Sequence, residues 1–186
     1  TNEGMKKSLL IFFILISWIV IDANASHLMG GSLCYEYVGL QPSGKYRYRV
    51  KLVTYIDCGP TSEIPYAEYP IKIGVYGNNL LMPNADKPLV DSLLLFIEDT
   101  VVYTPFLPPG CIIGSPTCII QARYSGVIDL SSSINGYYLF YERCCRNAAI
   151  LNLQPDGSDA FVSYITPTNV VNSTPVFLFP PIPFLC

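Results

Sequence analysis

The chain has 186 residues, a formal net charge of −3 and only 13% charged residues. This mildly acidic balance argues against nucleic acid or an anionic membrane surface as a partner, because both require a basic surface. Abundant tyrosine, phenylalanine, valine and isoleucine, punctuated by 16 prolines and 13 glycines, predict one β-rich domain with a sizeable core.

The first 25 residues are typical of a secretory signal peptide. Its three parts occur in order: the basic pair Lys6-Lys7, the apolar run Leu9–Ile21 and the cleavage site Ala23-Asn24-Ala25. The apolar run is shorter than the ~20 residues of a membrane helix, so a retained anchor is the weaker alternative. We expect a signal helix, no membrane span after cleavage and a mature chain from Ser26; Thr1–Gly4, ahead of Met5, are interpreted as an artefactual start.

All seven cysteines follow the expected cleavage site: Cys34, Cys58, Cys111, Cys118, Cys144, Cys145 and Cys186. In an exported chain they predict a disulfide framework, and their odd number leaves one thiol without a partner in this chain. Zinc is the weaker alternative because short-spaced cysteine pairs are absent and the only histidine, His27, is isolated. A local disulfide between Cys111 and Cys118 would close a proline-rich and glycine-rich loop.

Turn signals divide the first half of the mature chain into short strands. The expected strands are 28–39, 45–58, 71–76 and 89–103. Periodicity leaves the last one ambiguous, because its centre is a continuous apolar run. The strand 45–58 alternates most clearly, with one apolar face and one basic face. Its apolar face comprises Tyr46, Tyr48, Val50, Leu52 and Ile56, and its basic face Lys45, Arg47, Arg49 and Lys51.

The second half continues the same pattern. The expected strands are 117–130, 137–147 and 160–166, with a return to the core at 148–153. Ser125-Gly126 predicts a bulge or bend in the first of these. The strand 137–147 is aromatic and ends near the adjacent Cys144 and Cys145, whose side chains should point to opposite faces of a sheet.

This spacing of strands and turns predicts an all-β fold, an antiparallel β-sandwich of the immunoglobulin-like or jelly-roll-like kind, stabilised by disulfides. Residues 1–25 are the signal peptide, 26–168 the sandwich domain and 169–186 a proline-rich extended segment. We expect this segment to lead into a following module.

No catalytic, cofactor-binding or metal-binding residues are predicted, and the chain is interpreted as a non-enzyme. The single histidine lies beside the expected mature N-terminus, so a serine or cysteine nucleophile has no central base, and no Gly-x-Ser-x-Gly motif occurs. The segment Asp156–Asp159 is better explained as a turn than as a calcium loop. The basic stripe Lys45, Arg47, Arg49 and Lys51 is the candidate ligand surface, for an anionic glycan; the alternative is the solvated face of an antiparallel strand.

Four motifs occur together in one order: Ser26–Gly31, Tyr55–Cys58, Tyr141–Asn147, and Asn172–Phe177 with Pro180-Pro181 and a late Cys186. This combination resembles the N-terminal domain of large secreted surface proteins of Bacteroidota. Those proteins are described as gliding-motility-associated or PKD-repeat adhesin-like and are exported by type IX secretion. Ile56 departs from the arginine that such proteins often carry before the Asp-Cys pair. The resemblance implies the export machinery as a partner and further modules beyond Cys186.

We also expect a core disulfide between Cys58 and either Cys144 or Cys145. Cys186, the last cysteine of the matched pattern, would then pair with the other of these two. The disulfide candidates are therefore Cys58, Cys111, Cys118, Cys144, Cys145 and Cys186. Cys34 remains as the unpaired thiol.

We therefore expect a secreted, non-catalytic module of a cell-surface adhesin-like protein that contributes to surface display or attachment. Surface glycans or other cell-surface proteins are the expected partners. One alternative is a carbohydrate-binding module of a secreted polysaccharide-degrading protein, which predicts aromatic side chains on an exposed face. A glycosidase is a further alternative, and it requires two carboxylates facing each other at ~5–9.5 Å.

Overall fold

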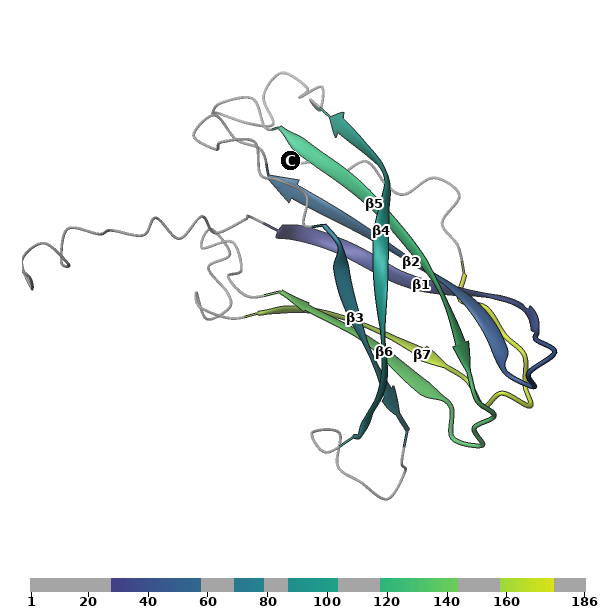
Figure 1. The fold of residues 1–186 in the computed structure, drawn as a ribbon. Helices are drawn as coiled ribbons and strands as arrows, with labels where there is room; N and C mark the ends of the chain where they lie inside the picture. Colours follow the sequence, from purple (N-terminus) through teal and green to yellow (C-terminus); the bar gives the residue numbers. More distant parts are fainter. Residues whose placement is uncertain (1–27, 58–68, 79–86, 104–117, 144–157, 176–186) are drawn as a thin grey trace, which may run out of the picture.

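The computed structural model describes residues 28–57, 69–78, 87–103, 118–143 and 158–175. These residues form seven antiparallel strands and, within the described ranges, no helix (Figure 1). The strands are β1 (Leu28–Leu40), β2 (Tyr46–Asp57), β3 (Ile71–Gly77), β4 (Leu89–Tyr103), β5 (Ile119–Leu130), β6 (Tyr137–Arg143) and β7 (Asp159–Ile165). Three predicted segments lie outside the described residues. They are the signal peptide, the end of the predicted strand at residues 144–147 and the return of the chain to the core at 148–153.

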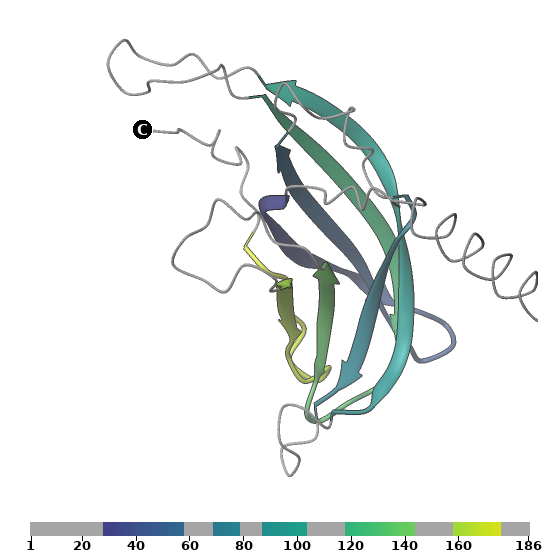
Figure 2. The same ribbon diagram turned by 90° about the vertical axis from the view of Figure 1, so that its left-hand side faces the viewer.

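The strands form one sheet in the order β1-β2-β5-β4-β3-β6-β7. The 15-residue β4 connects its two halves, because Leu89–Leu95 lies along β3 while Phe96–Tyr103 lies along β5. The sheet curves round until β7 returns close to β1 (Figure 2). The all-β, antiparallel part of the prediction is confirmed. The arrangement is one continuous, nearly closed, barrel-like sheet.

The apolar face predicted for β2 is confirmed, because the side chains of Tyr48, Val50, Leu52 and Ile56 are buried. Each neighbouring strand adds its own alternate residues, as the two-residue period of a strand requires. The largest fully buried side chains include Leu28, Ile71, Ile73, Leu95, Ile119, Tyr124, Leu139 and Ile165. The interior of the curved sheet is therefore filled by aliphatic and tyrosine side chains from all seven strands.

A cluster of tyrosines from β1 and β2 lies inside the sheet. The ring of Tyr48 is 5.8 Å from that of Tyr35 and 5.6 Å from that of Tyr37, and Tyr37 also meets Tyr46. Burial, followed by the neighbouring phenols, raises the pKa of Tyr48 to about 12. Burial also raises the pKa of Tyr35, so the phenols of Tyr35 and Tyr48 are neutral packing groups at neutral pH.

The bulge predicted at Ser125-Gly126 is wrong. β5 runs without interruption, and the irregularity lies on its neighbour β4, between Ile97 and Asp99. Gly126 instead permits close approach of β4, because a Cβ atom there would lie 2.7 Å from the carbonyl oxygen of Leu94. The glycine is therefore needed for close contact between strands.

Side chains and a short segment close the gap between β1 and β7. Near one end, the ring of Phe161 on β7 lies against Gly31 of β1. Near the other end of this gap, the chain turns after β7 and then lies along β1. We call the segment 172–175 that does so the strap. Thr174 bonds to both backbone groups of Tyr35, and the hydroxyl of Ser173 accepts a hydrogen bond from the amide of Tyr37. The strap therefore satisfies the edge of β1.

Candidate functional site

The basic stripe of the sequence lies on the outer side of β1, β2 and β5, where carboxylates from the neighbouring strands meet it. Arg47 binds its cross-strand partner Asp129 through two bonds of 2.7 Å, from Nε to Oδ1 and from a terminal nitrogen to Oδ2. Glu36 of β1 lies 3.4 Å from Arg49 and 3.8 Å from Lys51. The structure thus brings Arg47, Arg49 and Lys51 together with acidic partners.

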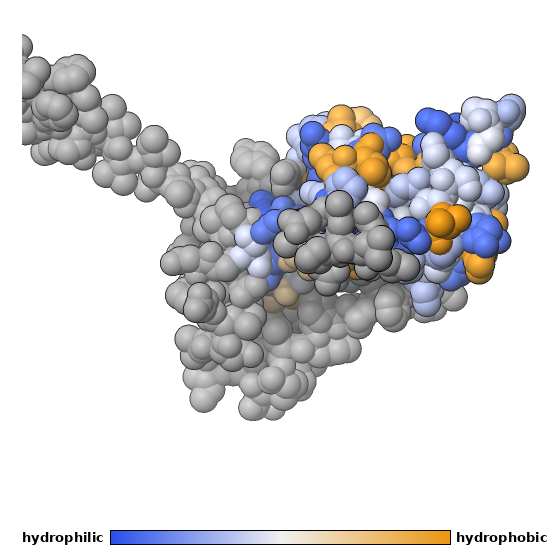
Figure 3. All heavy atoms as spheres, turned by 90° about the horizontal axis from the view of Figure 1, so that it is seen from below, coloured by the Kyte–Doolittle hydropathy of each residue, from blue (hydrophilic) through white to orange (hydrophobic). Residues whose placement is uncertain are grey.

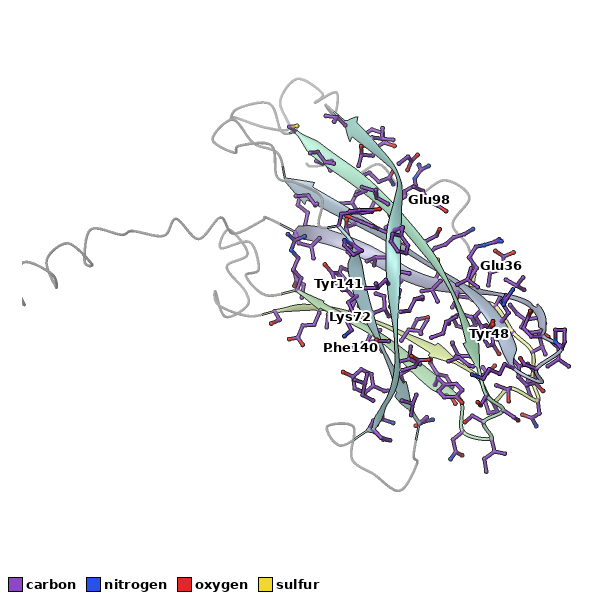
Figure 4. All side chains as sticks on the ribbon, viewed as in Figure 1. Glu36, Tyr48, Lys72, Glu98, Phe140 and Tyr141 are labelled. Atoms are coloured by element: carbon purple, nitrogen blue, oxygen red, sulfur yellow. The ribbon has the colours of Figure 1, made fainter. Side chains whose placement is uncertain are left out.

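A further ion pair extends this pattern to β4, where Asp99 lies 3.3 Å from Arg123 of β5. Glu98 accepts a hydrogen bond from the hydroxyl of Ser125. We call this surface, formed by β1, β2, β5 and the second half of β4, the charged face. Figure 4 labels Glu36 and Glu98 on it. Because both signs alternate across it, the charged face lacks the net positive field that an anionic ligand requires.

The pair formed by Arg47 and Asp129 makes stability depend on pH. The bond from Arg47 holds the pKa of Asp129 below its ordinary value of 3.8. The stabilisation that this pair gives is therefore complete above the pKa that Asp129 has in the unfolded chain. It is lost as the pH falls through the lower pKa that Asp129 has in the folded chain. We expect the stability difference between the wild-type chain and Asp129→Asn to be largest near neutral pH and to shrink below about pH 4. Urea unfolding of both chains across this range measures it, and a constant difference would contradict it.

Two of the seven cysteines lie within the described residues. Cys34 on β1 is a free thiol, and it donates a weak hydrogen bond of 3.7 Å to the carbonyl of Lys51. Burial raises the pKa of this thiol, which makes it a poor nucleophile. Cys118, just before β5, is disulfide-bonded. The five remaining cysteines, which are Cys58, Cys111, Cys144, Cys145 and Cys186, lie outside the described residues, so the pairing stays a prediction.

The opposite half of the sheet carries aromatic side chains on its outer side. Alternate residues of β3, β6 and β7 point away from the buried core, and four of them are aromatic: Tyr76, Tyr138, Phe140 and Tyr164. We call these four residues the aromatic face. Strand register places Tyr138 between Tyr76 and Tyr164 as a direct cross-strand partner of both. Phe140 lies in the next row, opposite Gly74 and Val162.

The rings of the aromatic face contact one another. Tyr76 and Phe140 meet edge to face at 6.0 Å, and Tyr138 and Tyr164 lie 4.9 Å apart. These are the separations that favour attraction between aromatic rings. Gly74 makes room for Tyr76, because a Cβ atom there would lie 2.6 Å from the Tyr76 ring. The face is thus an ordered group of rings from three strands.

A polar network fixes one end of the aromatic face. The ammonium group of Lys87 lies 4.3 Å above the centre of the Tyr138 ring and donates to Oδ1 of the buried Asn78. The amide nitrogen of Asn78 and the hydroxyl of Tyr164 both donate to the carbonyl of Asn135. The cation–π contact and these hydrogen bonds hold Tyr138 and Tyr164 in place.

The two faces differ in what they offer to a partner. In the view of Figure 4, Phe140 and Lys72 come from one half of the sheet, whereas Glu36 and Glu98 come from the other. Seen from below, the described surface carries small groups of hydrophobic residues separated by hydrophilic ones (Figure 3). Val162 is 56% exposed and Tyr164 36% exposed, so part of the outer side of β7 is open to a ligand.

Sequence patterns did not single out the aromatic face. A signal was present, because Tyr138 and Phe140, and likewise Val162 and Tyr164, alternate with buried residues along their strands. Alternation alone assigns two faces to each strand and does not show which residues face solvent. The order β3-β6-β7 was needed to bring these strands together.

Within the described ranges, no group of three or more histidine, cysteine, aspartate or glutamate side chains is placed to hold a metal ion. Among the same residues, no helix has the length and apolarity needed to cross a bilayer. Of the segment 156–159, which was predicted to be a turn and not a calcium loop, only Ser158 and Asp159 are described, and Asp159 begins β7.

No protein-family model, curated protein or solved structure matches the chain.

Proposed function

We propose that this chain is a non-catalytic, exported β-module of an adhesin-like surface protein, and that the aromatic face is its attachment surface. The observation that carries the proposal is the group of contacting rings on the outer side of β3, β6 and β7. Aromatic side chains combine a large apolar area with little conformational freedom, and they dominate the energetics of many binding surfaces. The charged face, whose ion pairs are exposed, contributes less.

The export and the architecture belong to the same proposal. Signal cleavage after Ala25, a disulfide framework, an immunoglobulin-like or jelly-roll-like relationship and type IX secretion in Bacteroidota are supported by the sequence motifs. A barrel-like β-domain whose outer side carries rings suits a module that displays a ligand-binding surface outside the cell. Surface glycans and other cell-surface proteins are the partner classes to test.

Removal of one ring should reduce attachment. Beads coated with the whole purified chain are passed over immobilised mucin, cellulose, chitin and collagen, and their retention is measured. We expect Phe140→Ala and Tyr164→Ala each to lower retention about tenfold on the material that the wild-type chain binds, as for an aromatic anchor in an interface. Circular dichroism provides the control for folding, because both variants should give the spectrum of the wild-type chain.

Matched changes on the charged face provide the control. Arg49→Ala removes one exposed ion pair with Glu36, and Val127→Ala removes an exposed aliphatic group from β5. Both should retain wild-type attachment, because neither touches the aromatic face. Equal losses of bead retention for variants of the two faces, or no loss of retention in Phe140→Ala, would refute the aromatic face as the attachment surface.

A carbohydrate-binding module of a polysaccharide-degrading protein is the second candidate, and the partly exposed side chains of the aromatic face favour it as well. The two candidates differ in the domains expected to be encoded after residue 186. Repeat domains and a sorting domain would support the adhesin-like protein, whereas a hydrolase domain would support the second candidate. Sequencing the gene downstream of this codon distinguishes them.

A further inference from the structure

The strap occupies an edge of the sheet. β1 and β7 are the two ends of the strand order, so among the described strands each pairs on one side alone. The amide and carbonyl of Tyr35 and the amide of Tyr37 point to the other side of β1, because the strap binds them there. An edge of this kind is a template for pairing with another chain. The strap therefore lies where a further β-strand fits.

The strap is held by hydrogen bonds without buried side chains. Four bonds join it to β1, and three of them use the hydroxyl groups of Ser173 and Thr174. None of the side chains of residues 172–175 is buried. Because water replaces such bonds when the strap opens, their net stabilisation is modest. We therefore expect the strap to open while the barrel stays folded.

A firm anchor precedes the strap and limits what opens with it. Thr168 is buried and bonds to the backbone of Ser133 and to the hydroxyl of Ser132. Val170 closes the turn after β7 through two further bonds. The chain can thus open from the exposed Val171 onward and leave β7 in place.

A second copy of β1 fits this edge in backbone and in charge. Both backbone groups of Tyr35 face the strap, as in a residue that exchanges two hydrogen bonds with its antiparallel partner. With Tyr35 of one copy opposite Tyr35 of the other, a two-fold axis relates the two strands. In that register Glu36 lies opposite Cys34 of the other copy, whose cross-strand neighbour is Lys51. The carboxylate of each copy then lies near an ammonium group of the other, and the two glutamates are not directly opposed.

We propose that the edge of β1 is a self-association site for a second copy of this chain, and that the strap controls access to it. In the closed state the strap satisfies Tyr35 and Tyr37, and the chain is a monomer. In the open state two β1 edges pair and the sheets of both copies become continuous. Because both copies must be open, the association constant rises with the square of the open fraction.

Three chains test the proposal: the wild type, Thr174→Val, and the double variant Ser173→Ala with Thr174→Pro. The double variant removes all four bonds, because proline supplies neither a hydroxyl nor an amide. Light scattering and sedimentation equilibrium are measured between about 1 and 200 µM, since a monomer–dimer equilibrium depends on protomer concentration. We expect association to strengthen in the order given. If about one wild-type chain in ten is open, the double variant should associate about a hundredfold more tightly.

Hydrogen exchange supplies the open fraction and locates the contact. In the double variant the amides of Tyr35 and Tyr37 should exchange fast at low protein concentration and regain protection as the concentration rises. The association constants of the three chains should follow the square of the open fraction that exchange at Tyr35 gives. Thr100→Val on β4 should associate and exchange as the wild-type chain does. If the double variant does not fold, the comparison of Thr174→Val with the wild type decides by the same relation.

Four results would overturn the inference. The first is a double variant that loses protection at Tyr35 and stays monomeric at the highest concentration. The second is a dimer in which Tyr35 and Tyr37 remain unprotected, because the contact then lies elsewhere. The third is wild-type protection at Tyr35 in the double variant, because the strap then does not cover the edge. The fourth is a covalent dimer on a non-reducing gel, which would assign association to Cys34, whose thiol adjoins Thr174.

Discussion

Replacing Gly136 by alanine is expected to destabilise the fold by about 3–5 kcal/mol. Gly136 precedes β6 with φ +72°, a left-handed conformation that disfavours any side chain. A Cβ atom there would lie 2.1 Å from the carbonyl oxygen of Ile165, which belongs to the backbone and cannot rotate away. The residue must therefore move, and the end of β7 with it.

The carbonyl of Gly136 adds to this effect. It accepts hydrogen bonds from the amide of Asn78 and from the hydroxyl of Ser133, so a shift of residue 136 also disturbs both partners. Equilibrium unfolding in urea, followed by tyrosine fluorescence, measures the loss. We expect a lower midpoint with an unchanged slope, which indicates reduced stability of the same fold.

Gly44 provides the matched control. It lies in the turn between β1 and β2 with φ +78°, and no atom lies within 4 Å of a Cβ placed there. Gly44→Ala should therefore cost only the conformational strain of about 1–2 kcal/mol. Equal losses at the two glycines would show that the contact with Ile165 does not matter.

Replacing Thr174 by valine is expected to cost about 1–3 kcal/mol. The hydroxyl of Thr174 accepts a 2.9 Å hydrogen bond from the amide of Tyr35 and donates one of 3.0 Å to its carbonyl. Valine has nearly the same shape but supplies neither bond, so the Tyr35 amide loses its partner at a part-buried position. The amide of Thr174 still bonds to the carbonyl of Tyr35, so the strap need not detach completely.

Hydrogen exchange distinguishes this local effect from general destabilisation. The amides of Tyr35 and Tyr37 should exchange faster in Thr174→Val, whereas those of the central β5 should follow global stability. Thr100→Val, the same substitution at an exposed position of β4, should change stability by less than about 0.5 kcal/mol. Unchanged exchange at Tyr35 would show that the strap does not protect the edge of β1.

Local sequence pattern predicted the strands well because alternation is a property of a single strand. The inward residues of β2 and the boundaries of β3 and β4 agree with the prediction to within one residue. The ambiguous apolar run of β4 is a strand, with Leu93 and Leu95 buried and Leu94 and Phe96 exposed. That pattern was hidden in the sequence because apolar residues occupy both faces.

Pairing between strands was not accessible in the same way. The sequence placed Lys45, Arg47, Arg49 and Lys51 on one side of one strand, but the acidic partners of the arginines come from β1 and β5. A stripe that looks basic in isolation is charge-paired in the folded chain, because a sheet places residues far apart in sequence directly opposite each other.

The sequence by itself determined an all-β antiparallel chain, the approximate spans of its strands and the apolar side of β2. It also determined the motif Asn172-Ser173-Thr174-Pro175, though not its use, since Thr174 binds a residue 139 positions away. Tertiary structure alone decided that the sheet curves into a nearly closed barrel-like form, that the strap lies along β1 and that four rings meet outside β3, β6 and β7. The reason is physical: alternation sets the two sides of a strand, whereas strand order and curvature decide which sides meet and which face the solvent.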